Sequence, residues 1–148
     1  MLWMLPLLGT ALAEEPESSA PQKWHRHSVA AGVGHHYGIL GLQYTYRPVV
    51  EFDVAAAVGL GGVALQGRFH PLPWRPLYVA GGMGPIVYSE ELGTRYGGDF
   101  TAGVELADTA FHLNAGVGAG AAAIPGGLRV NLVLDLGIGF SFVRPGEG

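Results

Sequence analysis

Apolar and polar positions alternate most clearly near the end of the chain. From Leu128 to Phe142 every even position is apolar, whereas the odd positions are mostly polar or glycine, with Val133 as the exception. A period of two predicts a β-strand with one apolar and one polar face. The segment exceeds the ~3–10 residues of most strands and suits a tilted membrane-crossing strand of roughly 9–11 residues with projecting ends.

The same alternation recurs upstream, in short segments separated by Gly, Pro and Asp. Together with 128–142, strands are predicted at about 25–35, 39–47, 49–60, 63–70, 77–88, 99–107 and 111–123.

Two regions between these strands are less regular. In 77–88 the apolar residues change parity, and Tyr78 and Ile86 fall on the face opposite Leu77, so a bulge near Gly81-Gly82 is predicted. Ser89–Gly98 is polar and is predicted to be the longest loop and the contact site at the cell surface.

Eight strands joined by short hairpins can close up-and-down, which removes both sheet edges. In lipid such closure is required, because unpaired backbone groups cost several kcal/mol each there. Eight strands of about ten residues with their turns need on the order of 120 residues, which 24–143 supplies. The predicted fold is all-β: an eight-stranded antiparallel up-and-down transmembrane β-barrel.

Aromatic residues support a membrane location, because they gather at strand ends, as interfacial girdles do. With the N-terminus on the periplasmic side, one rim is predicted to carry Trp24, Tyr44, Tyr46, Phe52, Phe69, Trp74, Tyr78, Phe111, Phe140 and Phe142. The opposite rim is predicted to carry Tyr37, Tyr88, Tyr96 and Phe100.

Composition narrows the function classes. Hydrophobic residues make up 49% of the chain and charged residues 14%, below the ~25% of soluble domains. The net charge of −4 argues against a nucleic-acid partner. The chain has no cysteine, which excludes disulfides and thiolate metal sites.

The first residues have the pattern of an export signal. Residues 1–13 are apolar and end in Ala11-Leu12-Ala13, which predicts a signal peptide, although no Lys or Arg precedes the core and a buried helix is the alternative. Residues 14–23 predict a disordered N-terminal tail. Residues 144–148 form a C-terminal tail after the barrel.

Two motifs resemble a known family. The end of the last strand, with Asp135, Gly137, Phe140 and Phe142, resembles the C-terminal β-signal that the barrel-assembly machinery recognises. The sequences RPLYVAGGMG and GGDFTAGVEL resemble small bacterial outer-membrane barrels of the OmpA/OmpX type. The resemblance implies a bacterial outer-membrane location, with outer-membrane lipid and, during insertion, the assembly machinery as partners.

The polar face is predicted to fill the barrel interior, because the lumen of an eight-stranded barrel is just wide enough for side chains. Charges enclosed there must pair. The predicted structural plug consists of Arg47, Glu51, Asp53, Arg68, Glu105, Arg129 and Asp135.

No catalytic, cofactor or metal site is predicted. His112 and Ser141 could share the lumen, but no motif supports them as a base and nucleophile. His25 and His27 lie on one strand face and His35-His36 near an outer loop, whereas a tight metal site needs three or four ligands.

The predicted function is therefore a non-catalytic structural or surface-interaction role in the outer membrane. The alternatives are a small passive or gated pore, a lipid-modifying barrel enzyme, and a soluble lipocalin-like barrel whose apolar face would point inward.

Overall fold

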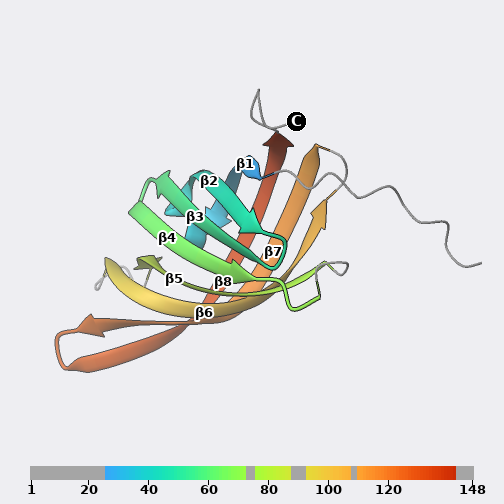
Figure 1. The fold of residues 1–148 in the computed structure, drawn as a ribbon. Helices are drawn as coiled ribbons and strands as arrows, with labels where there is room; N and C mark the ends of the chain where they lie inside the picture. Colours follow the sequence, from blue (N-terminus) through green and yellow to red (C-terminus); the bar gives the residue numbers. More distant parts are fainter. Residues whose placement is uncertain (1–25, 73–75, 88–92, 108–109, 143–148) are drawn as a thin grey trace, which may run out of the picture.

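The structure, a computed structural model, describes residues 26–72, 76–87, 93–107 and 110–142. Within these residues, eight strands follow one another around a closed antiparallel barrel, and β8 pairs with β1 to close it (Figure 1). The elements are β1 (His27–Gly34), the 3-10 helix η1 (His35–Tyr37), β2 (Ile39–Val49), β3 (Phe52–Gly59), β4 (Gly62–Phe69), β5 (Leu77–Val87), β6 (Thr94–Ala107), β7 (Phe111–Ile124) and β8 (Gly127–Phe142). The predicted eight-stranded up-and-down barrel is confirmed. The predicted signal peptide and both tails lie outside the described residues.

Alternation along each strand sets which side chains face out. On β8, Leu132 is 72% exposed, whereas the neighbouring Val133 is 4% exposed and lies inside the barrel. Val133 is therefore an apolar residue on the inward face and does not interrupt the alternation. Most large apolar side chains of the eight strands point outward, as the exposed residues Val29, Leu42, Val54, Leu65, Met83, Phe100, Val117 and Leu134 illustrate. A soluble barrel with an apolar interior is excluded by this arrangement.

One rim carries a row of outward aromatic residues. Phe111 packs edge-on against Phe140, with ring centroids 5.5 Å apart. Tyr46, Phe52, Phe69 and Phe142 are exposed at the same rim.

Two aromatic residues do not belong to the predicted rims. Tyr78 and Tyr37 are buried in the barrel interior, so their assignment to the two rims was wrong. Trp24, Trp74 and Tyr88 lie outside the described residues.

Strand β5 contains no bulge. Its pairing with β4 and with β6 continues through Gly81 and Gly82 without a shift, so the predicted change of parity is wrong. Tyr78 and Ile86 are simply large residues on the inward face.

Strand β6 begins earlier than the sequence predicts. Residues 94–98 belong to it and pair with 83–87, so half of the predicted loop Ser89–Gly98 is sheet. The hydroxyl of Tyr96 accepts a hydrogen bond from the backbone N–H of Val63, which ties this extension to β4.

The connection from β1 to β2 folds into the barrel. Three of its four residues form η1 and are buried, so strand one ends before His35. Gly38 ends η1 with a φ of 63°, a left-handed conformation that glycine adopts most readily. A Cβ at Gly38 would lie 2.5 Å from the carbonyl oxygen of Gly62. Glycine thus allows this connection to contact the β3–β4 turn closely.

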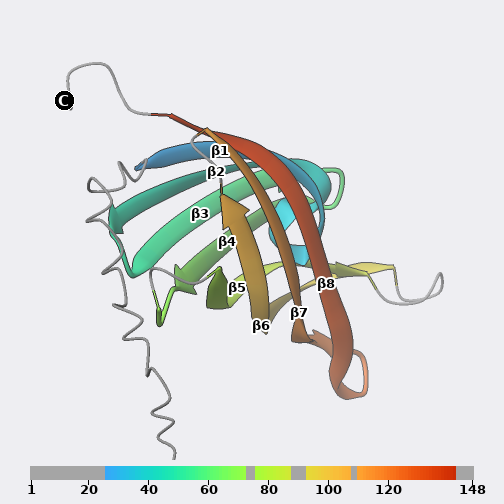
Figure 2. The same ribbon diagram turned by 90° about the vertical axis from the view of Figure 1, so that its right-hand side faces the viewer.

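The β7–β8 hairpin projects beyond its neighbours (Figures 1 and 2). Strand β1 pairs only with residues 135–142 of β8, whereas β7 pairs with β8 as far as the turn. Among the described residues, the structure contains no helix with the length and apolar character needed to cross a membrane.

Candidate functional site

The polar side chains inside the barrel form two groups. We call Arg47, Asp53, Arg68, His70 and Glu105 the arginine cluster, and His35, His36, Gln66, Asp99 and Asp135 the histidine cluster. Strands β2, β3, β4 and β6 supply the first, with His70 directly after β4. The helix η1 and strands β4, β6 and β8 supply the second.

Asp53 is the centre of the arginine cluster and is 0% exposed. Its Oδ1 accepts a hydrogen bond from Nε of Arg68 at 2.9 Å, and its Oδ2 accepts one from Nη2 of Arg47 at 3.0 Å. Nε2 of His70 lies 2.8 Å from the same Oδ2. Glu105 supplies a second carboxylate, 3.2 Å from Arg47. Two guanidinium groups therefore neutralise two carboxylates.

Arg68 is buried and also donates hydrogen bonds to neutral groups. Its Nη2 donates to Oγ1 of Thr45 at 3.1 Å and to Oε1 of Gln43 at 3.3 Å. The ring of Tyr78 lies against the guanidinium, 5.6 Å from centroid to Cζ, within the range of a cation–π contact. These contacts hold one charged side chain across the lumen.

The histidine cluster is centred on His36, which is 1% exposed. Its Nε2 lies 2.7 Å from Oδ2 of Asp99, and its Nδ1 lies 2.9 Å from Oδ2 of Asp135. Its backbone N–H donates to Oδ1 of Asp135 at 2.9 Å. Nε2 of His35 lies 3.4 Å from Oδ1 of Asp99, and its Nδ1 lies 3.1 Å from the carbonyl oxygen of Pro85. Two carboxylates therefore flank one imidazole.

Five of the residues predicted for the interior plug lie inside the barrel. Arg47, Asp53, Arg68 and Glu105 meet in the arginine cluster, and Asp135 belongs to the histidine cluster.

Glu51 and Arg129 are exposed, so their assignment to the plug was wrong. Glu51 lies in the β2–β3 turn, after the register shifts between Tyr46 and Val49. Arg129 has the inward parity of Asp135 but lies on the projecting hairpin, outside the part of β8 that pairs with β1.

Among the residues of the predicted assembly signal, Asp135 is buried and Phe140 and Phe142 point outward. Gly137 leaves room for the ring of Tyr37, whose hydroxyl a Cβ at that position would overlap. The positions that resemble the signal thus also have structural roles in the folded barrel.

The proximity of His35, His36 and Asp99 is not predicted by the sequence pattern. Asp99 has the same parity as Thr101 and Glu105, which indicates the lumen. The histidine pair enters the lumen because η1 folds inward, and no local sequence pattern indicates this inward fold.

His112 and Ser141 do face each other inside the barrel, with Oγ of Ser141 3.4 Å from Nδ1 of His112. That distance exceeds the usual 2.5–3.0 Å of hydrogen bonds donated by a hydroxyl group. No described carboxylate is hydrogen-bonded to His112 to orient it, so the pair lacks the third member of a catalytic triad.

Comparison with known proteins supports the fold. No family model matches the chain, and no curated protein matches it in sequence. Among solved structures, it is similar to the N-terminal β-barrel domain of Pseudomonas aeruginosa OprF, with a TM-score of 0.52 and 16% sequence identity. The match covers 78% of this chain and 96% of that chain. By its fold, then, the chain is an eight-stranded β-barrel of the same kind as the N-terminal domain of OprF.

Proposed function

We propose that the chain is a bacterial outer-membrane β-barrel with a structural or surface-interaction role and no catalytic activity. The observation that carries this proposal is the continuous outward apolar surface of a closed barrel with a charged interior. A soluble protein rarely exposes contiguous apolar patches larger than a few hundred Å². In a membrane, acyl chains cover such a surface, and barrel closure satisfies the backbone.

The proposed partners follow from two features of the chain. Outer-membrane lipid would contact the apolar surface, and the aromatic rim formed by Tyr46, Phe52, Phe69 and Phe111 would lie at one interface. The barrel-assembly machinery would recognise the end of β8 during insertion. The apolar N-terminal segment, predicted to be a signal peptide, supports export.

The filled interior favours the structural role over a pore. The two clusters connect strands on different sides of the lumen, and η1 occupies one end of it. An eight-stranded barrel has an interior that side chains just fill. We therefore expect no ion conduction.

Extraction and gel mobility test the proposal. The full chain, expressed with export in a bacterium, should sediment with the outer membrane and dissolve only in detergent. The folded barrel should migrate differently on a gel before and after boiling. Reconstituted protein should show no conductance above that of bare lipid. Recovery in buffer without detergent would contradict the membrane role, and discrete conductance steps would support the pore.

A further inference from the structure

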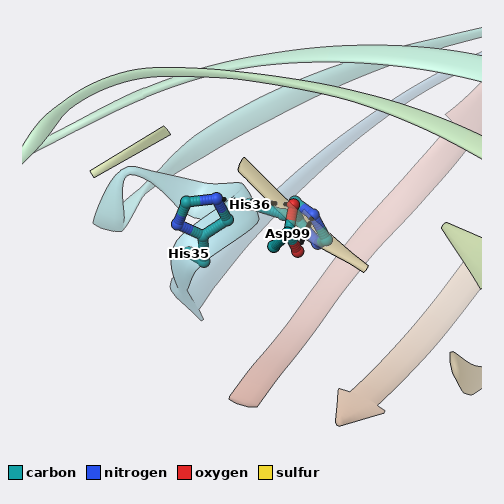
Figure 3. Close-up of side chains that lie close together, drawn as sticks. All are labelled: His35, His36 and Asp99. Atoms are coloured by element: carbon teal, nitrogen blue, oxygen red, sulfur yellow. Dashed lines mark ion pairs between the residues drawn. The ribbon is translucent and has the colours of Figure 1, made fainter. Parts of the chain in front are cut away.

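We propose that His35, His36 and Asp99 form a binding site for a divalent transition-metal ion of the zinc type inside the barrel. The three side chains come from η1 and β6, which are distant in sequence, and meet in the lumen (Figure 3). Their ligand atoms all lie within 4.8 Å of one another. This inference rests on the fold and goes beyond the proposed function.

The donor spacing suits a four-coordinate ion. Bonds of about 2.0–2.2 Å in a tetrahedral site place neighbouring donors about 3.3 Å apart. The distance of 3.4 Å between Nε2 of His35 and Oδ1 of Asp99 is already close to this donor separation. The 2.7 Å between Nε2 of His36 and Oδ2 of Asp99 must open by roughly half an ångström. The ligand atoms of His35 and His36 lie within 4.8 Å of each other.

The other ring nitrogens are held as they are in metal-binding histidines. Nδ1 of His35 faces the carbonyl of Pro85, which can only accept, so Nδ1 carries the proton and Nε2 has a free lone pair. Nδ1 of His36 faces Oδ2 of Asp135, and a carboxylate behind an imidazole is a common second partner in metal sites. Nε2 of the Gln66 side-chain amide also lies 2.8 Å from this Nδ1, and its Oε1 accepts a hydrogen bond from Nε2 of Gln43.

The atoms facing the proposed ion contact one another as ion pairs, His35 and His36 each with Asp99. Nε2 of His35, Nε2 of His36 and both carboxylate oxygens of Asp99 are buried and make no hydrogen bond of acceptable geometry. Buried polar groups are satisfied in most proteins, so an unsatisfied group of this kind requires an explanation. A dication would bind both imidazole nitrogens and one carboxylate oxygen of Asp99. Its two charges would also balance the carboxylates of Asp99 and Asp135.

Gly82 leaves space beside these ligand atoms. It lies opposite Asp99 on β6 and opposite Gln66 on β4. A Cβ at Gly82 would lie 3.0 Å from Nε2 of His36 and 3.1 Å from Oδ1 of Asp99. A water molecule could complete the coordination, since three protein ligands leave a fourth position open.

The donor set selects the kind of ion. Two imidazoles and one carboxylate suit zinc, nickel or copper, whereas calcium and magnesium prefer oxygen ligands alone. Asp53, His70 and Glu105 also converge in the arginine cluster. There Arg47 and Arg68 already supply the positive charge, so no ion is needed.

Zinc titration of the full chain, refolded in detergent micelles and stripped with EDTA, tests the site. Calorimetry should show one Zn²⁺ bound per chain, with a rise in melting temperature that EDTA reverses. Zinc-edge X-ray absorption should show two imidazole ligands. His35→Gln and Asp99→Asn should abolish this binding, and Asp135→Asn should weaken it about 10–100-fold, as loss of an outer partner does.

His27→Gln is the matched control, because His27 is a buried barrel histidine that instead faces the hydroxyl of Tyr44. It should bind zinc normally. Circular dichroism and gel mobility verify that each variant folds. If His35→Gln does not fold, the nearly isosteric Asp99→Asn variant tests the site. Two results would overturn the proposal: no zinc binding by the folded protein, or binding that persists in both ligand variants.

Discussion

Asp53→Ala is expected to lower the free energy of unfolding by about 3–5 kcal/mol, the usual cost of removing one partner from a buried ion pair. The substitution leaves the buried guanidinium of Arg68 without the carboxylate that accepts its Nε–H. Arg47 keeps Glu105 as a partner, whereas Arg68 lies 3.5 Å from that carboxylate at best. Denaturant unfolding in lipid vesicles, followed by circular dichroism, measures the loss.

Glu51→Ala is the control for Asp53→Ala, because it removes a nearby carboxylate that is exposed in the β2–β3 turn. It should change stability by no more than about 0.5 kcal/mol. The double variant Asp53→Ala with Arg68→Met should recover part of the loss, because it removes the unpaired charge. Equal effects of Asp53→Ala and Glu51→Ala would show that the arginine cluster does not stabilise the barrel.

Leu42→Arg is expected to lower stability in a bilayer by about 2–4 kcal/mol, as a charge on the lipid face near the midplane does. Leu42 is 57% exposed, and its neighbours on the adjacent strands are Ala31 and Val58, both also outward. The arginine would therefore have acyl chains and apolar side chains around it. Denaturant unfolding in vesicles, compared with the unsubstituted chain, gives the difference.

Leu128→Arg introduces the same charge at an outward leucine on the projecting hairpin. Leu128 is 72% exposed and lies next to the β7–β8 turn, beyond the part of β8 that pairs with β1. Its substitution should cost only about 0–1 kcal/mol, as near a membrane interface. If both substitutions lower the free energy of unfolding equally, the cost of a charge on the outer surface does not depend on depth in a bilayer.

The fold could be predicted from the sequence because one property, alternation, determines both the strands and their faces. It correctly separates Leu132 from Val133, even though both are apolar. On β5 the prediction of a bulge is wrong, because Tyr78 and Ile86 are large residues on the inward face of a regular strand. Parity shows which face a residue is on, and side-chain character alone does not.

The interior could be predicted only in part, because parity does not give the height along the barrel. Arg129 and Asp135 share a parity, but Asp135 is buried in the part of β8 that pairs with β1, whereas Arg129 lies outside that part and is exposed. The extension of β6 through residues 94–98 depends on pairing with β5, so a polar local sequence gave no sign of it. The histidine cluster needs η1 to fold inward against Asp99 and Asp135, which are far away in the sequence.

The contact between the outward apolar face and lipid can be measured with nitroxide labels, because the chain contains no cysteine and a single substitution gives a single label. Leu42→Cys places the label on the lipid face, and Glu51→Cys places it on an exposed turn. In vesicles, the label at position 42 should collide more with lipid-dissolved oxygen than with a water-soluble nickel chelate, and the label at 51 should show the reverse. Preferential collision of the position-42 label with the nickel chelate would mean that this face is in water, and would contradict a membrane-spanning barrel.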